Sequence, residues 1–383
     1  MKFSKFGKRL TCDAGILSLM DDLGDARCSG EGEMIMMGGG NPGYVPEFQE
    51  LLRRHLGDVC EDPRAFRNLV GAYSPPQGDL DFNASLARLL KNEFGWRVEP
   101  ENICLTNGSQ TAFFMLFNLF AGRFADGSRK KICLPLAPEY IGYADLGLCD
   151  DFFVTTRPTI EYIDEVFFKY HIDFQALNVG EDIGAICVSR PTNPTGNVIT
   201  DQEVASLAAL AKVRDIPLII DSAYGLPFPG MVFAEANPHW DDNTVVCLSL
   251  SKLGLPAVRT GIIVAGREIV RALASMNAIM SLSPGNFGAV LTQRLIESGE
   301  IIEMSRNLMT PFYRSKMEKA VACVREACAG IPYRIHKPEG AMFLWLWFPG
   351  LPISSLELYR RLKDQGALVV SGHYFFPGLE GDW

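Results

Sequence analysis

The chain has 383 residues, of which 48% are hydrophobic and 21% charged, and its formal net charge is −9. This length can bury a large core and exceeds one ordinary domain. The acidic balance, without any Lys/Arg cluster, argues against nucleic acid as a partner. The longest apolar stretch, residues 341–348, is far shorter than the roughly 20 residues of a membrane-spanning helix. The basic start of the chain is followed by no apolar run, so we expect no signal peptide. We therefore expect a soluble, cytoplasmic protein.

Ten cysteines and five histidines are scattered along the chain. The cysteines form no Cys-x-x-Cys pair, and none lies near paired histidines at metal-ligand spacing. Small buried thiols in a reducing compartment are therefore favoured over disulfides or zinc. We expect no metal site.

Short apolar segments alternate with helical segments from about residue 102 to residue 265. Most of the short segments are continuous apolar runs, which is typical of strands buried on both faces. The predicted strands are residues 103–106, 131–134, 152–155, 185–189, 217–221, 245–249 and 261–265. Helices are predicted at 109–120 and at 201–213, the second opened by the capping box Thr200-x-x-Glu203. The pattern predicts an α/β fold with a mostly parallel, seven-stranded sheet covered by helices.

The two chain ends have a different pattern, with long helices near 286–296 and 311–329 and a late strand at 342–348. We assign these ends to a smaller α+β domain. The predicted division has an N-terminal arm and part of the small domain at 1–50, a large domain at 51–283, and the rest of the small domain at 284–383.

Chemically suggestive residues follow the predicted strands. Ligands of parallel sheets bind beyond the carboxyl ends of the strands, so we expect these residues to form one site. They are Gly108 and Ser109, Asn193, Asp221 and Tyr224, and the segment from Ser249 to Lys252.

Lys252 follows a buried strand directly. A lysine in a closed site loses its proton readily and can form a Schiff base with an aldehyde, although a lone lysine at a strand end is more often an ordinary surface residue. Arg259, shortly downstream, favours the functional interpretation because its guanidinium can clamp a phosphate with two parallel hydrogen bonds.

Three further segments each have a functional and a structural interpretation. Gly108 and the start of the next helix offer free N–H groups to an anion, but a turn with an N-cap has the same sequence. Asp221 could hold the proton of a pyridine nitrogen, and a helix N-cap is equally compatible. Asn193 lies in a turn by composition, where its amide could donate to a ring oxygen or a carboxylate.

The conjunction of these segments is the strong signal. A phosphate cradle, Asn-Pro-x-Gly, Asp-x-x-Tyr, Ser-x-Ser-Lys and a downstream Arg occur in this order, each after a strand. The chain therefore resembles the aminotransferases of fold type I, which depend on pyridoxal 5′-phosphate (PLP). Within them it resembles the group that exchanges an amino group between L-alanine or pyruvate and L-valine or 3-methyl-2-oxobutanoate. The resemblance runs from Phe3 to about Gly378 and is carried by residues 38–42, 105–110, 135–143, 187–196, 249–256 and 336–347.

The resemblance implies a role for each matching residue. Lys252 would bind PLP covalently and move the substrate α-proton, and Asp221 would pair with the pyridinium nitrogen. The residues implied at the phenolic oxygen are Tyr224 and Asn193. Further cofactor-binding residues implied are Tyr140, which would stack on the ring, Gln110, and the phosphate binders Gly108, Ser109, Ser249, Ser251 and Arg259. The substrate carboxylate would meet Gly39, Gly40 and Asn193. Tyr73 would reach the phosphate of a neighbouring subunit, which implies a homodimer.

Some expectations are open. Members of the superfamily carry a small-domain arginine for the substrate carboxylate a little beyond the segment that matches 372–378, whereas the last arginine here is Arg361. We therefore expect PLP binding with weakened transamination, as in a truncated chain; β-elimination on the same scaffold is a further alternative. We also expect the Asn193–Pro194 bond to be cis, since a cis proline in a functional turn is usually required.

Overall fold

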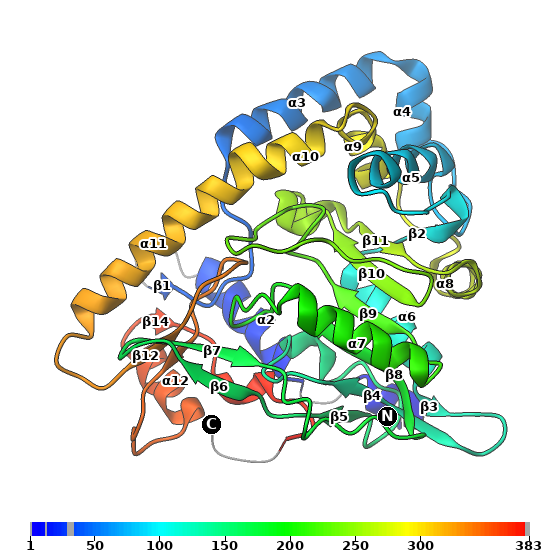
Figure 1. The fold of residues 1–383 in the computed structure, drawn as a ribbon. Coiled ribbons are helices and arrows are strands. Elements are labelled where there is room, and N and C mark those ends of the chain that lie inside the picture. The colour runs from blue at the N-terminus through cyan, green and yellow to red at the C-terminus, as the bar shows by residue number, and fades with distance from the viewer. Residues whose placement is uncertain (1, 12–13, 29–33, 380–383) are drawn as a thin grey trace.

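A mixed sheet forms the centre of the computed structural model, which describes residues 2–11, 14–28 and 34–379 (Figure 1). All seven predicted strands are present, each within two residues of its expected bounds. They are β2 (Ile103–Thr106), β4 (Arg129–Leu134), β5 (Phe153–Thr155), β8 (Ile183–Ser189), β9 (Leu218–Asp221), β10 (Thr244–Ser249) and β11 (Gly261–Val264). The strand order is β2-β11-β10-β9-β8-β4-β3, with β5 paired to β4. β11 runs antiparallel to both of its neighbours, and the other pairs among the seven are parallel.

The predicted number of strands was wrong by one, because the sheet has eight. The additional strand, β3 (Gly122–Arg123), is antiparallel to β4. Two residues are too few to show any hydrophobic periodicity, so β3 could not be predicted from its sequence pattern.

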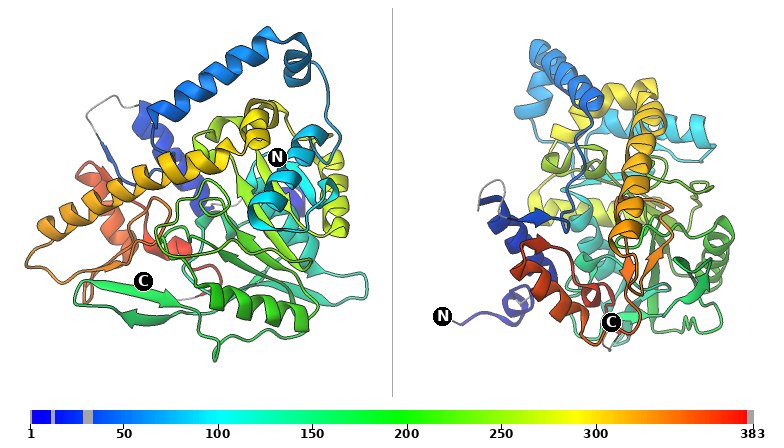
Figure 2. Two further views of the ribbon diagram at one scale, coloured as in Figure 1. Left: turned by 45° about the horizontal axis from the view of Figure 1, so that its top comes forward. Right: turned by 90° about the vertical axis from the view of Figure 1, so that its left-hand side faces the viewer.

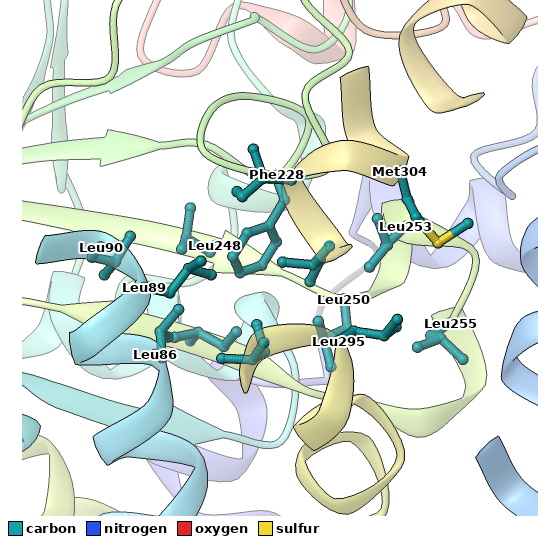
Figure 3. Close-up of a cluster of buried hydrophobic side chains, with 14 of the residues drawn as sticks. Leu86, Leu89, Leu90, Phe228, Leu248, Leu250, Leu253, Leu255, Leu295 and Met304 are labelled. Carbon is teal, nitrogen blue, oxygen red and sulfur yellow. The ribbon is translucent and has the colours of Figure 1, made fainter. Parts of the chain in front are cut away.

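Helices cover both faces of the sheet. On one face, α6 (Ser109–Phe120) and α8 (Arg267–Ser281) share a hydrophobic cluster with the strands. On the other face, α7 (Asp201–Val213) packs at one end, and α5 (Leu80–Phe94) with α9 (Phe287–Ser298) packs at the other. The helices α6 and α7 have their predicted bounds, and the capping box of Thr200 and Glu203 is formed. Figure 3 shows the cluster on the α5/α9 side.

A second sheet joins the middle of the chain to its C-terminal part. Its order is β13-β12-β7-β6, from β6 (Thr159–Tyr162), β7 (Phe167–His171), β12 (Arg334–His336) and β13 (Leu346–Trp347). The late strand expected at 342–348 is thus confined to two residues. The hairpin of β6 and β7 was not predicted, because β6 has four residues, all exposed, and its alternation of Ile160 and Tyr162 with polar residues is too short to identify a strand.

The chain ends meet in a two-stranded parallel sheet of β1 (Ile35–Met36) and β14 (Ala367–Leu368). Near it lie α2 (Gly15–Cys28) and α12 (Ser355–Asp364), which are joined by an ion pair between Asp22 and Lys363. The short helix α1 (Lys5–Arg9) lies instead beside the segment between β4 and β5, where Arg9 donates to the carbonyl of Gly147 at 2.8 Å. Another side is formed by α3 (Pro46–Glu61), α4 (Pro63–Val70), the short α10 (Glu300–Met304) and the long α11 (Thr310–Ala327) (Figure 2). The domain boundaries given above stay a prediction.

Within the described residues, no helix is long and apolar enough to cross a membrane. The same part of the chain holds no group of three or more His, Cys, Asp or Glu side chains suited to a metal ion. Its cysteines at positions 60, 104, 133, 149, 187, 247, 323 and 328 are free thiols.

Candidate active site

The predicted site residues lie at one edge of the central sheet. Asp221 is the last residue of β9, and Lys252 lies in a single helical turn directly after β10. Gly108 precedes α6, and Asn193 follows β8. Because β2, β8, β9 and β10 are parallel, their carboxyl ends deliver these side chains to the same place.

Hydrophobic neighbours hold the turn that carries Lys252. Leu250 and Leu253, on either side of it, are fully buried in the cluster with Leu295 of α9 (Figure 3). The lysine is therefore anchored by its neighbours, while its own amine remains available on the other side of the turn.

The Lys252 amine meets the N-terminal part of the chain. Its Nζ donates to the carbonyl oxygen of Gly40 at 2.6 Å and lies 5.2 Å from the ring centre of Tyr224. Burial, followed by the positive charge of Arg259, lowers the pKa of Lys252 from 10.5 to about 8. The amine is therefore a nucleophile at a lower pH than an ordinary lysine. A Cβ added at Gly40 would lie 3.9 Å from Lys252 Nζ, and the roles of Gly39 and Gly40 in binding the substrate stay a prediction.

Asp221 is buried and well hydrogen-bonded. It accepts from the hydroxyl of Tyr143 at 2.6 Å and from the N–H of Ala223 at 2.9 Å. No helix begins after it, so the N-cap interpretation is not supported. Burial raises the pKa of Asp221, while the Tyr143 and Ala223 hydrogen bonds and the charge of Lys252 oppose the shift. A carboxylate placed in this way can hold a positively charged ring nitrogen.

The segment around Gly108 is shaped for an anion. No side chain caps the N-terminus of α6, so the first backbone N–H groups of this helix can donate to a bound anion. A Cβ at Gly108, whose φ is +94°, would lie 2.3 Å from the Arg259 guanidinium, so only glycine allows this approach. Arg259 in turn lies 3.4 Å from the Ser251 hydroxyl. Helix N-terminus, guanidinium and hydroxyl are donors that fit a phosphate.

The remaining predicted residues surround this centre less closely. Ser249 accepts from the N–H of Ser251 at 3.2 Å, so its hydroxyl supports the turn. Gln110 donates to the carbonyl of Gly142, and its own side-chain oxygen is buried without a partner. Tyr140 packs edge-on against Tyr143, with ring centres 5.4 Å apart. Tyr73 is 85% exposed and lies at the surface of the chain.

The expected cis bond at Asn193–Pro194 was wrong. The cis peptide in this turn is Arg190–Pro191, three residues earlier. The Asn193 amide nevertheless donates to the Tyr224 hydroxyl at 3.4 Å.

Sequence reasoning missed three buried polar residues behind Asp221. They are Glu139, Tyr143 and Ser189, and they are linked to Asp221 by hydrogen bonds. One signal was available, since Ser189 ends a buried strand in the same way as Asp221 does.

A nucleophilic lysine, a buried aspartate and an anion cradle at this edge of such a sheet define a PLP-binding enzyme of fold type I. The family model for aminotransferase class I and II matches residues 64–379. The chain belongs to that family and is a PLP-dependent aminotransferase.

Individual relatives narrow the comparison. The chain is 52% identical to the valine–pyruvate aminotransferase of Escherichia coli (strain K12), covering 100% of this chain and 91% of that protein. A crystal structure of a putative amino-acid aminotransferase from Psychrobacter arcticum 273-4 is 47% identical, with a TM-score of 0.96 over 99% of this chain and 91% of the other. The valine–pyruvate aminotransferase structure from Salmonella typhimurium LT2 is 50% identical, with a TM-score of 0.87 over 96% and 90%. The lyase alternative is not favoured by these relatives.

The lowered pKa of Lys252 has a measurable consequence. In the PLP-free chain, the rate of covalent PLP capture is expected to rise about tenfold per pH unit up to roughly pH 8 and then to level off, because only the neutral amine attacks. Stopped-flow absorbance measures this rate, and Lys212→Ala, which removes an exposed lysine, is the control. A rate that still rises toward pH 10.5 would show that burial does not activate Lys252.

Proposed function

We propose that the chain transfers an amino group between L-alanine or pyruvate and L-valine or 3-methyl-2-oxobutanoate. The observation that carries this proposal is the 52% identity to the E. coli valine–pyruvate aminotransferase over the full chain. The contacts of Lys252 with Gly40 and of Asp221 with Tyr143 are consistent with transamination chemistry at this position.

PLP, when bound, supplies an electron sink for the bond that breaks at the substrate α-carbon. The chain's own residues hold the reactants in place. Arg259, Ser251 and the start of α6 bind the phosphate, with Gly108 allowing the close approach. Tyr224 and Asn193 hold the phenolic oxygen, and Tyr140 covers the ring. The backbone at Gly39 and Gly40, with the Asn193 amide, receives the substrate carboxylate.

Two residues act on protons. Lys252 would move the proton between the substrate α-carbon and the cofactor, which its lowered pKa allows near neutral pH. Asp221 keeps the proton on the pyridine nitrogen through its negative charge, which raises the pKa of that nitrogen by roughly 1–3 units. The burial of Asp221 strengthens its interaction with the ring nitrogen.

The proposal includes a homodimer with shared sites. Exposed apolar side chains gather near Tyr73 and near the start of α9, and Asn286 joins these two segments by donating to the carbonyls of Asn68 and Ala72 at 2.9 and 3.4 Å. The exposed apolar residues in these segments are Phe66, Val70, Tyr73, Ile279, Met280, Leu282 and Phe287. Such a patch is typical of a subunit interface, and Tyr73 would reach the partner's phosphate from it.

We also place the enzyme in the cytoplasm and in amino-acid biosynthesis. Free buried thiols such as Cys104, Cys187 and Cys247 support a reducing compartment.

The substrate assignment predicts a preference for uncharged side chains. Of the described residues, Arg259 is the one guanidinium whose charge acts on Lys252, and we assign it to the phosphate. A second, distal carboxylate would therefore be left unpaired, at a cost that corresponds to a loss on the order of 10²-fold in kcat/KM. We expect alanine to react with 3-methyl-2-oxobutanoate faster than aspartate reacts with 2-oxoglutarate. Equal efficiency with both pairs would contradict the assignment.

A further inference from the structure

Glu139 is a buried carboxyl that the mechanism above does not use. It lies in the loop after β4, and its side chain is wholly inaccessible. Its backbone N–H donates to the carbonyl of Phe375 at 2.8 Å, which ties the loop to the C-terminal segment. In the described part of the chain its carboxyl has no Lys or Arg partner; its contacts are with Ser189 and the Tyr140 N–H.

A continuous set of hydrogen bonds leads from Glu139 to Asp221. The Ser189 N–H donates to Glu139 Oε1 at 2.8 Å, and the Ser189 hydroxyl lies 2.5 Å from Glu139 Oε2. That hydroxyl is 3.4 Å from the hydroxyl of Tyr143, which lies 2.6 Å from Asp221 Oδ2. All four side chains are buried, so water does not compete for these bonds.

The direction of these hydrogen bonds depends on the protonation of Glu139. Each hydroxyl carries one proton, and that of Tyr143 is donated to Asp221, so at its 3.4 Å contact with Ser189 the Tyr143 oxygen can only accept. An ionised Glu139 accepts the Ser189 proton at 2.5 Å, whereas a neutral Glu139 can supply its own carboxyl proton to this contact and leave the Ser189 proton for Tyr143. A neutral Glu139 therefore aligns every hydroxyl toward Asp221. An ionised Glu139 would turn the Ser189 proton away from Tyr143.

The surroundings favour the neutral form of Glu139. An unpaired buried carboxylate is costly, and burial together with the like charge of Asp221 raises the pKa of Glu139 from 4.5 to about 8, against the lowering effect of its hydrogen bonds. The other ionisable groups that face this cluster are Tyr140 and Tyr143 on its own loop, Cys187 on β8 and Asp221 on β9.

We propose that neutral Glu139 is a positioning residue that, through Ser189 and Tyr143, keeps Asp221 ionised and oriented toward the pyridine nitrogen. The inference rests on the role proposed for Asp221 and extends it. Without the aligned donors, Asp221 binds its proton more tightly, so the ring nitrogen carries less positive charge and withdraws electrons less strongly.

The test compares variants that break the chain of donors with one that preserves it. Ser189→Ala and Glu139→Leu interrupt it, whereas Glu139→Gln keeps a donor and an acceptor in nearly the same shape. Glu203→Gln, at the buried capping box of α7, is a matched control for altering a buried carboxyl elsewhere. We measure kcat and KM for each holoenzyme, and the pH midpoint of the visible absorption band of the lysine-bound cofactor.

Ser189→Ala and Glu139→Leu should lower kcat about fivefold to tenfold, the size expected for one weakened hydrogen bond, with little change in KM. Both should move the absorption midpoint upward, because a less positive ring nitrogen favours protonation elsewhere on the cofactor. Their effects should not add in the double variant, since they break the same chain. Glu139→Gln and Glu203→Gln should keep the wild-type midpoint and kcat.

A cofactor-independent measurement tests the charge of Glu139. A carboxyl whose pKa is raised in the folded state stabilises the fold at low pH and loses this contribution as pH rises. The unfolding free energy of the PLP-free wild type relative to Glu139→Gln should therefore fall between about pH 4.5 and about pH 8 and stay level above. A constant difference would overturn the neutral form.

Other outcomes distinguish a failure of the positioning role of Glu139 from a failure of the proposed function. If Asp221→Ala impairs turnover but Ser189→Ala and Glu139→Leu change neither kcat nor the midpoint, the positioning role is wrong while the proposed function stands. If Glu139→Gln behaves like Glu139→Leu, the residue acts as a charge and the proposal is overturned. Should Glu139→Leu fail to fold, Ser189→Ala alone decides, because it removes a single oxygen.

Discussion

Lys252→Ala is expected to abolish transamination, with a loss on the order of 10⁴-fold or more, because one amine supplies both the covalent attachment and the proton transfer. The structure explains why Lys212 cannot replace Lys252. Lys252 Nζ is held at Gly40 inside the site, whereas Lys212 is exposed on α7.

Lys212→Ala is the matched control and should retain wild-type turnover. The assay measures the pyruvate that forms when alanine transfers its amino group to 3-methyl-2-oxobutanoate. A Lys252→Ala protein that keeps more than a small fraction of the wild-type kcat would contradict the assignment.

Asp221→Ala is the second change with a large expected effect. Removal of its charge leaves the pyridine nitrogen without the partner that raises its pKa by roughly 1–3 units. We expect α-proton removal to slow by on the order of 10³-fold. PLP should remain bound, because the residues proposed for its phosphate, Gly108 and Arg259, lie close to each other and do not involve Asp221.

The slowed step can be measured as a deuterium isotope effect with α-deuterated alanine, which should increase in the variant. Asp126→Ala, in the exposed turn between β3 and β4, is the control. Loss of PLP together with loss of activity would show that Asp221 serves cofactor retention rather than the electron sink.

The central sheet could be predicted because its strands are buried on both faces. Residues such as those of β9 and β10 form continuous apolar runs between helices, and that signal is local. The hairpin of β6 and β7 was missed because its stability comes from pairing of β7 with β12, far away in the sequence. The alternation of polar and apolar residues in β6 extends over four exposed residues, which is too short to identify the strand by itself.

The site could be predicted as far as residues follow strands directly. Lys252 and Asp221 were found because polar side chains at the end of a buried run are unusual, and because the order of the motifs matches a family. Glu139 was missed because its burial depends on the return of the C-terminal segment, whose Phe375 carbonyl accepts its N–H. No local pattern distinguishes a glutamate buried in this way from one at the surface.

Chemical mapping of the bound cofactor tests directly whether Lys252 is the lysine that carries PLP. Borohydride reduction of the purified, PLP-loaded protein fixes the cofactor on its lysine, and peptide mass spectrometry then locates it. We expect a single reduced adduct on Lys252, and the visible absorption band should disappear as this adduct forms. An adduct on Lys212 or Lys316, with Lys252 unmodified, would contradict it.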